Sequence, residues 1–124
     1  MYKVQIEDCQ NIGKLDFIEW EQFREKVILI TGSTGLIGSN LVNALAYNSQ
    51  AKELDIKLVL PVRNVSATKE KFSWNGAKII PYSLDSDLKI NETIDYIVHL
   101  ASPTSSKYFT ENPVDTMLIN IEGT

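Results

Sequence analysis

The sequence predicts an α/β protein with an incomplete parallel sheet of about four strands and flanking helices. Apolar runs of strand length alternate with segments of helical periodicity, which is typical of parallel strands joined by right-handed crossovers. Residues 27–30 form an aliphatic run, as expected of a strand buried on both faces. A glycine-rich loop at 31–38 follows directly and leads into a helical pattern. A strand, a glycine loop and a helix in this order indicate a Rossmann-type fold.

Each later element is expected from its own local pattern. The helix after the loop carries apolar residues at helical spacing, namely Ile37, Leu41, Ala44 and Leu45. Strands are predicted at 57–62, 78–82 and 95–101, and a short helix is predicted around 69–72.

A last helix is predicted to begin at Pro113, with Asn112 as its N-cap. Proline suits this first helical position because its missing N–H would have no partner there. The apolar stripe of this helix consists of Val114, Met117, Leu118 and Ile121.

The chain is expected to contain one domain at 26–124, preceded by an N-terminal extension at 1–25. Within the extension, an irregular amphipathic pattern predicts one short helix that packs on the domain. Its residues are Leu15, Ile18, Trp20 and Phe23.

Composition and charge exclude several classes of partner. A formal net charge of -4 argues against a nucleic acid or an anionic membrane as partner, because both are negatively charged and bind basic patches. The single cysteine, Cys9, permits no internal disulfide, and we interpret it as a structural residue rather than a nucleophile. No signal segment or run of the roughly 20 apolar residues needed to span a bilayer is visible. We therefore expect a cytoplasmic location, and the pattern suggests no metal site.

The glycine loop predicts an anion site. Gly32 would permit the tight turn out of the strand, Gly35 would let a pyrophosphate approach the backbone, and Gly38 would let the helix lie close to the strand. The helix N-terminus supplies unsatisfied N–H groups and a favourable dipole. A nucleoside-triphosphate loop is excluded because no Gly-Lys-Ser/Thr follows. The alternative is a glycine-rich turn without a ligand.

The run from Ile28 to Gly38 resembles the extended short-chain dehydrogenase/reductase family, which comprises NAD(P)-dependent epimerases and dehydratases of nucleotide sugars. Three more segments match in order: the strand at 95–102, the Asn-x-x-Gly-Thr at 120–124, and Asp85 after the third strand. Residues 99–103 and 112–113 look most like UDP-glucuronate decarboxylases and related enzymes. The resemblance covers about residues 26–124. It implies that these residues are the N-terminal, truncated part of an NAD(P)-binding Rossmann domain.

The resemblance also implies a set of cofactor contacts. The backbone of Leu36 and Ile37 would join the three glycines in holding the pyrophosphate, and Asp85 would accept a hydrogen bond from the adenine amino group. The nicotinamide-side ribose would be lined by Leu100, Ala101 and Ser102 and braced by Asn120.

Each of these contacts has a structural alternative. Asp85 shares a polar loop with Asp87, so either residue could be the equivalent one or could be merely solvated. Asn120 could instead satisfy a buried polar group in its helix. His99 is interpreted as a core histidine rather than a catalyst.

The choice of nicotinamide cofactor depends on the end of the second strand. NAD-binding members present a carboxylate there to the ribose 2′-OH, whereas this chain has Arg63. A guanidinium could pair with the 2′-phosphate of NADP, so NADP is favoured. Alternatively, Arg63 stacks on the adenine and does not distinguish the two cofactors.

The catalytic pair of the family is not visible. The family uses a Tyr-x-x-x-Lys pair, in which lysine lowers the pKa of the tyrosine, and none of the five tyrosines is followed by lysine at that spacing. We therefore expect the N-terminal NAD(P)-binding portion of a nucleotide-sugar epimerase, dehydratase or decarboxylase that acts by transient hydride transfer. The 124 residues alone are expected to be inactive and to expose a hydrophobic sheet edge.

A homodimer is expected for the full-length protein. Two other functions stay open. One is an NADP-dependent carbonyl reductase of the same extended family. The other is a non-catalytic NAD(P)-sensing module, if the chain truly ends at Thr124.

Overall fold

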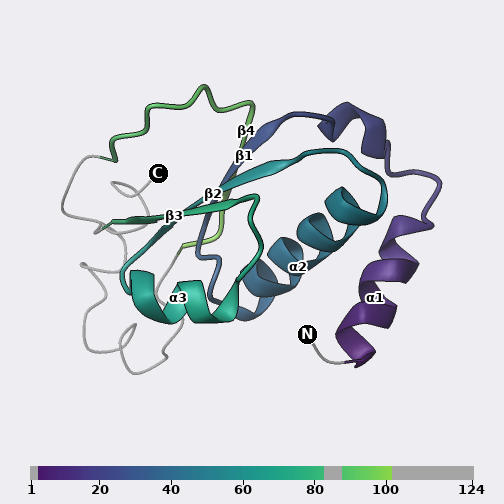
Figure 1. Cartoon of the computed structure of the whole chain (residues 1–124), viewed down its shortest axis with the longest axis horizontal. Helices are drawn as coiled ribbons and strands as arrows, with labels where there is room; N and C mark the ends of the chain where they lie inside the picture. The colour runs from purple at the N-terminus through teal and green to yellow at the C-terminus, as the bar shows by residue number, and fades with distance from the viewer. Residues whose placement is uncertain (1–2, 83–87, 102–124) are drawn as a thin grey trace, which may run out of the picture.

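A computed structural model describes residues 3–82 and 88–101 (Figure 1). The elements follow one another as α1 (Lys3–Gly13), the short 3-10 helix η1 (Trp20–Phe23), β1 (Val27–Thr31), α2 (Leu36–Ala51), β2 (Lys57–Val62), α3 (Val65–Lys71), β3 (Ala77–Pro81) and β4 (Tyr96–His99).

The four strands form one parallel sheet in the order β3-β2-β1-β4. In this register Leu29 lies between Val59 of β2 and Ile97 of β4. The order 3-2-1-4 is that of the first half of a doubly wound Rossmann sheet. The predicted α/β fold with an incomplete parallel sheet is confirmed.

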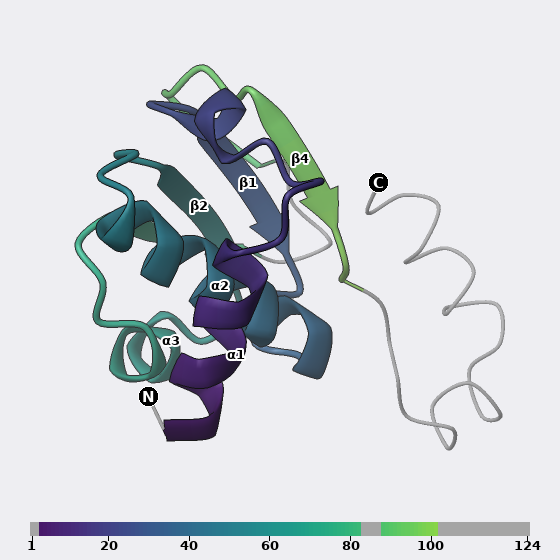
Figure 2. The same ribbon diagram turned by 90° about the vertical axis from the view of Figure 1, so that its right-hand side faces the viewer.

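Helices α2 and α3 lie on the same side of the sheet (Figures 1 and 2). The chain steps from β1 to β2 and from β2 to β3 in the same direction across the sheet. Because both crossovers are right-handed, their helices lie on the same face. The core on this side joins Ile30 and Leu60 of the strands to Val42 and Leu45 of α2, all buried. Full burial of each such side chain contributes about 1.5–3 kcal/mol.

Helix α1 packs on α2 rather than on the sheet. The buried side chain of Asn48 donates from Nδ2 to the backbone carbonyl of Cys9 at 3.0 Å and to that of Ala44 at 2.9 Å. On the surface, Gln10 Nε2 donates to the Tyr47 hydroxyl at 3.0 Å. These contacts attach α1 to the C-terminal half of α2.

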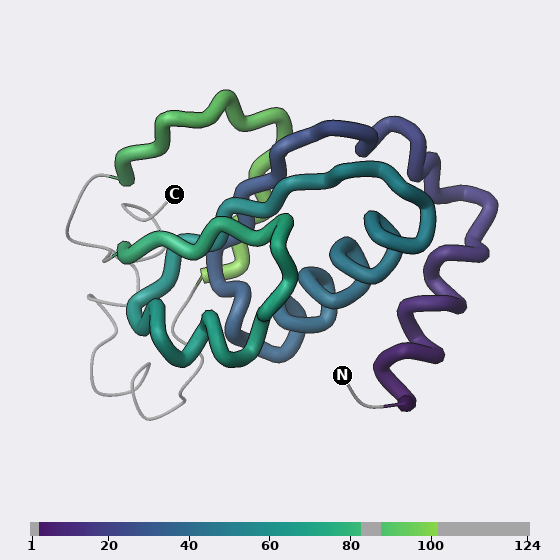
Figure 3. Tube along the Cα trace, in the orientation of Figure 1, coloured from purple at the N-terminus to yellow at the C-terminus, as the bar shows by residue number. Residues whose placement is uncertain are grey.

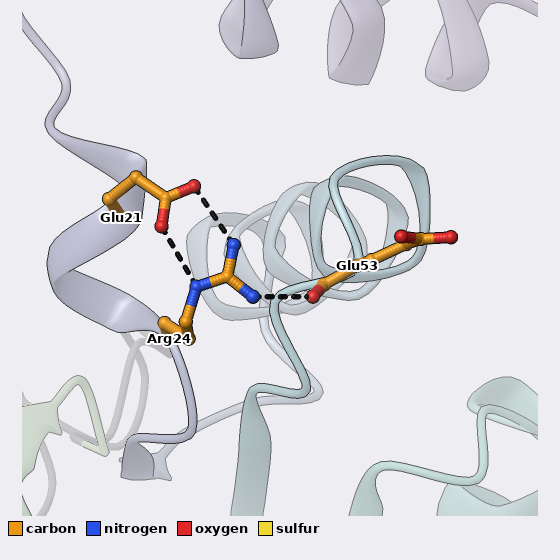
Figure 4. A network of polar contacts seen from close by, with 3 residues as sticks. All are labelled: Glu21, Arg24 and Glu53. Atoms are coloured by element: carbon orange, nitrogen blue, oxygen red, sulfur yellow. Dashed lines mark hydrogen bonds and ion pairs between the residues drawn. The ribbon is translucent and has the colours of Figure 1, made fainter.

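An arginine fixes η1 to the turn between α2 and β2 (Figure 4). Arg24 pairs with Glu21 at 2.8 Å and donates from Nη1 to the backbone carbonyl of Glu53 at 2.9 Å. Glu25, Glu53 and Asp55 in this corner have φ of 57°, 54° and 53°, an uncommon conformation for residues other than glycine.

The structure corrects the prediction for the extension. The helix expected from Leu15, Ile18, Trp20 and Phe23 is wrong, since only the four-residue η1 forms there. The main helix is instead α1, which carries one buried residue, Cys9. The division at residues 25 and 26 stays a prediction.

The remaining boundaries shift by a few residues. α3 begins at Val65 rather than near residue 69, because Asn64 caps it by accepting a hydrogen bond from Ala67 N at 3.0 Å. β3 and β4 are shorter than expected or shifted by one residue. The helix predicted from Pro113 lies outside the described residues. Among the helices that the structure describes, none is long and apolar enough to cross a bilayer.

Candidate functional site

Gly32 makes the turn out of β1 and could not be another residue. Its φ of +69° lies in the left-handed region, which favours glycine. A Cβ there would lie 2.7 Å from the carbonyl carbon of Leu100 and 2.8 Å from Ala101 N. Figure 3 shows the end of β4 passing beside the turn between β1 and α2. Gly32 therefore lets the carboxyl ends of the neighbouring strands β1 and β4 lie close together.

Gly38 lets the first turn of α2 lie against the loop. A Cβ on Gly38 would be 2.1 Å from the carbonyl oxygen of Gly32, well inside van der Waals contact. Gly38 is also buried. The sequence predicts a close approach of this helix to the strand, and the contact observed at Gly38 is with the loop that directly follows β1.

Gly35 differs from the other two glycines because no internal contact requires it. Its φ and ψ are -71° and 175°, and a Cβ there would meet only Gly32 O, at an ordinary 3.4 Å. None of the described residues therefore fills the space in front of Gly35. The missing side chain leaves the backbone accessible from outside, as the approach of a pyrophosphate would need.

The N-terminus of α2 carries no side-chain cap. Gly35 is the N-cap, no side chain among residues 3–82 and 88–101 bonds the first-turn N–H groups, and the first turn holds no acidic residue. The hydrogen-bond ladder of α2 begins with Ser39 N donating to Gly35 O at 2.9 Å. The N–H groups of Leu36 and Ile37 precede this ladder, so they are available to an anion. Both side chains are exposed, at 81% and 71%.

Ser33 contributes a second feature that the sequence analysis missed. It is fully buried, and its hydroxyl has no hydrogen-bond partner in the described part of the chain. An unpartnered buried hydroxyl costs about 1–3 kcal/mol. In the sequence, its position between Gly32 and Gly35 was the one signal that Ser33 belongs to the loop.

Leu100 and Ala101 lie beside the glycine turn. Leu100 N donates to Thr31 O at 3.2 Å, and both residues donate from N to the Thr31 hydroxyl. That hydroxyl also contacts His99 Nδ1 at 2.7 Å. His99 is half-buried and hydrogen-bonded within the fold, as a core histidine would be.

Two cations lie near the loop. Arg63 is exposed and follows directly on the end of β2. Lys71, at the end of α3, donates from Nζ to Thr34 O at 3.3 Å, which places a positive charge against the glycine loop. Sequence reasoning did not find Lys71, because the crossing of α3 over the loop is a tertiary feature.

The predicted site residues Asp85, Ser102 and Asn120 lie outside the described residues. Within the described ranges, no group of three or more histidine, cysteine, aspartate and glutamate side chains could hold a metal ion. The described site can bind and orient an anion by its backbone.

A family model described as the NAD dependent epimerase/dehydratase family matches residues 28–124. The chain is 34% identical over 101 residues to UDP-glucuronic acid decarboxylase 3 of Arabidopsis thaliana, covering 78% of this chain and 28% of that protein. It is 31% identical to Protein CapI of Staphylococcus aureus, covering 77% and 31% of the two chains.

A putative UDP-glucose 4-epimerase of Methanocaldococcus jannaschii is 30% identical, with 79% of this chain and 31% of that protein covered. The chain thus spans less than a third of the length of these relatives. The family match begins at β1 and includes the glycine loop, whereas α1 precedes it. On the sheet order, the glycine geometry and this match, the chain belongs to the NAD-dependent epimerase/dehydratase family.

Proposed function

We propose that this chain forms the NAD(P)-binding part of a nucleotide-sugar epimerase, dehydratase or decarboxylase that works by transient hydride transfer. One observation carries the proposal. Among the described residues, the N-terminus of α2 has no side-chain cap, and nothing fills the space in front of its N-cap, Gly35. A helix N-terminus of this kind binds phosphate oxygens through its N–H groups and its dipole.

The residues of the loop have different roles in binding the cofactor. The backbone N–H groups of Leu36 and Ile37 would donate to the cofactor's pyrophosphate, while Gly32 and Gly38 keep loop and helix close enough to present them. Leu100 and Ala101 would line the nicotinamide-side ribose. When bound, the cofactor supplies the hydride acceptor and donor, and the chain positions it. Asp85, Ser102 and Asn120 stay part of this proposal.

NADP rather than NAD is the cofactor we favour, because a guanidinium follows β2 where a carboxylate would hold the 2′-OH. Arg63 is exposed, so it is accessible to a 2′-phosphate. A charge-assisted bond contributes about 1.5–3 kcal/mol, roughly ten- to hundredfold in affinity. Arg63→Gln should therefore weaken NADP binding and leave NAD binding unchanged. An equal loss for both cofactors would instead mean that Arg63 stacks on the adenine.

The substrate class and the assembly are proposed from the relatives and the exposed strand. Two of the relatives named above are described as enzymes of UDP-glucuronic acid and UDP-glucose, which supports a nucleotide-sugar substrate. A homodimer of the complete protein is also proposed. The large apolar side chains Tyr96 and Ile97 of β4 are 42% and 69% exposed, which supports association.

The variant Gly35→Asp should lose cofactor affinity without losing folding stability, so it tests binding apart from folding. An aspartate at the N-cap bonds first-turn N–H groups and is worth about 0.5–2 kcal/mol to a helix, so the variant should fold at least as well as the parent. Its carboxylate would occupy the anion site. We expect calorimetry to show at least about a hundredfold loss of NADP and NAD affinity, about 2.8 kcal/mol.

Gly35→Ser is the matched neutral control, since serine caps the helix without a charge. It should lose clearly less affinity than Gly35→Asp. Unchanged binding by Gly35→Asp, or no affinity of the parent for either cofactor, would refute the proposal.

A further inference from the structure

The turn that leads into β3 contains the one Asn-Gly pair of the sequence, Asn75-Gly76. Ala77 N donates to Trp74 O at 3.2 Å, so Asn75 and Gly76 are the two central residues of a four-residue turn. Asn75 is exposed. Its side-chain amide therefore lies in solvent, next in the chain to the backbone nitrogen of a glycine.

The described contacts hold neither of these two groups. Among residues 3–82 and 88–101, no hydrogen bond involves the Asn75 side chain, and the Gly76 N–H has no acceptor. Two other asparagines differ. The buried Asn48 amide donates to two backbone carbonyls, and Asn64 Oδ1 accepts from Ala67 N at 3.0 Å. The fold thus restrains the amides of Asn48 and Asn64, whereas no described contact restrains that of Asn75.

Gly76 has no side chain that could separate the two groups. A Cβ on Gly76 would overlap the Trp74 ring, so the fold requires glycine at this position. A side chain there would also hinder the approach of the Asn75 Cγ to the Gly76 nitrogen. The packing of the Trp74 ring therefore keeps, directly after Asn75, the residue that least obstructs a reaction between them.

We propose that Asn75 is a site of spontaneous deamidation in the folded chain. The Gly76 nitrogen loses its proton to hydroxide and attacks Cγ of Asn75. A bond forms between these two atoms, the bond from Cγ to Nδ2 breaks, and the leaving nitrogen takes a proton from water and departs as ammonia. The product is a five-membered succinimide.

Water then opens the succinimide at either of its carbonyl groups. Opening at Cγ gives aspartate, and opening at the main-chain carbonyl gives isoaspartate, in which the chain runs through Cβ. The whole conversion consumes one water and releases one ammonia, without oxidation or reduction. Both products add one negative charge to a chain whose formal net charge is already -4.

Isoaspartate weakens the start of the pairing between β2 and β3. It inserts one extra methylene into the main chain just before Gly76, whose carbonyl oxygen accepts from Leu58 N at 2.9 Å. In the described sheet β3 is an edge strand that pairs only with β2, so it has no second partner to hold it. The turn lies at the N-terminal end of β3, whereas the glycine loop follows the carboxyl end of β1. The proposal therefore does not depend on cofactor binding.

Incubation of the whole folded chain at neutral and mildly alkaline pH tests the proposal. Peptide mapping by mass spectrometry should show a gain of about 1 Da at Asn75, in two products that separate by chromatography. The rate should rise with pH because the attacking nitrogen must lose its proton. Asn48 and Asn64 are internal controls and should stay unmodified. The indole N–H signal of Trp74 should change over the same period, and that of the buried Trp20 should not.

Two variants test the reaction and its structural effect. Asn75→Gln keeps an exposed amide but would have to close a six-membered ring, which is much slower, so the gain in mass should disappear. Asn75→Asp adds the charge without the extra methylene. Hydrogen exchange of the Leu58 amide should therefore match the parent in Asn75→Asp and should accelerate in the isoaspartate form.

Three results would overturn the proposal. They are an unmodified parent chain after incubation, an equal gain in mass in Asn75→Gln, and a reaction more than about tenfold slower in the folded chain than in urea, which would show that the turn protects Asn75. Unaltered exchange of Leu58 in the isoaspartate form would refute the effect on β3. The parent chain alone decides whether Asn75 reacts if a variant does not fold.

Discussion

The Thr31 hydroxyl and the His99 imidazole form a 2.7 Å hydrogen bond whose direction is set by the backbone around it. The Thr31 oxygen accepts from Leu100 N at 3.0 Å and from Ala101 N at 3.2 Å, which occupies both of its lone pairs. Its single hydrogen must therefore be donated to His99 Nδ1. In its neutral form His99 then carries its proton on Nε2.

This tautomer is directly measurable. Long-range ¹H–¹⁵N spectra of the single histidine should show a pyridine-type shift at Nδ1 and a pyrrole-type shift at Nε2 in the neutral form. Thr31→Val removes the hydroxyl donor and should bring the two nitrogen shifts closer together. The reverse tautomer in the parent protein would contradict the hydrogen-bond assignment.

Thr31 is also expected to stabilise the fold. In Thr31→Val, the N–H group of Ala101 loses its acceptor while that of Leu100 keeps Thr31 O, and a donor left without a partner costs about 1–3 kcal/mol. We expect a loss of this size in the free energy of unfolding, measured in urea. Thr31→Ser keeps the hydroxyl and should lose clearly less. A valine variant as stable as the serine variant would show that the hydroxyl contributes nothing.

The glycines of the loop should respond differently to a single methyl group. Gly38→Ala places Cβ 2.1 Å from Gly32 O, so loop and helix must separate, at a cost of about 1–3 kcal/mol. Gly35→Ala meets only an ordinary contact and should change stability by less than about 1 kcal/mol. Thermal unfolding of both variants checks this order. Equal losses would mean that the close approach at Gly38 is not needed.

Asn48 should control the docking of α1. Asn48→Ala removes the side-chain hydrogen bond that joins α2 to the Cys9 carbonyl of α1 and should cost about 0.5–1.5 kcal/mol. Hydrogen exchange of amides in α1 should accelerate more than exchange in β1 and β2, because the bond belongs to the interface between α1 and α2. Gln10→Ala removes only an exposed bond to Tyr47 and is expected to change stability by less than about 0.5 kcal/mol.

Cys9 should be unreactive in the folded chain. It is 3% exposed, and burial, with a smaller contribution from Asp8, raises the pKa of its thiol above the ordinary 9.0. Because the neutral thiol is favoured in the fold, this contribution to stability is complete below pH 9 and is lost as pH rises through the raised pKa. Ellman's reagent at pH 8 should react slowly with the native chain and rapidly in urea. Equally fast reaction in both would mean that α1 does not stay docked.

The sheet was predictable because its strands carry their signal locally. Ile28, Ile30, Leu58 and Leu60 belong to continuous apolar runs, and a strand buried on both faces needs no other information. The glycine loop was predictable for the same reason, because its three regularly spaced glycines come directly after β1 in the sequence. The roles of Gly32 and Gly38 then follow from contacts within a few residues and with the end of β4.

The misplaced elements depend on contacts that sequence patterns do not contain. Helix α1 has one buried residue, Cys9, and its attachment relies on the side chain of Asn48, 39 residues away. The start of α3 did have a local signal, the Asn64 cap, which the apolar pattern around residue 69 obscured. The contact of Lys71 with the loop became visible only once α3 and the loop were placed together.

The attachment of α1 to one half of α2 has a practical consequence. Tyr47 and Asn48 belong to the last turns of α2, whereas the glycine loop lies at its first turn, at the far end of a sixteen-residue rod. At 1.5 Å per residue, roughly 15 Å of helix separates the two. A fluorophore placed on the exposed Gln10, which contacts Tyr47 in those last turns, would therefore report on the protein without crowding the glycine loop.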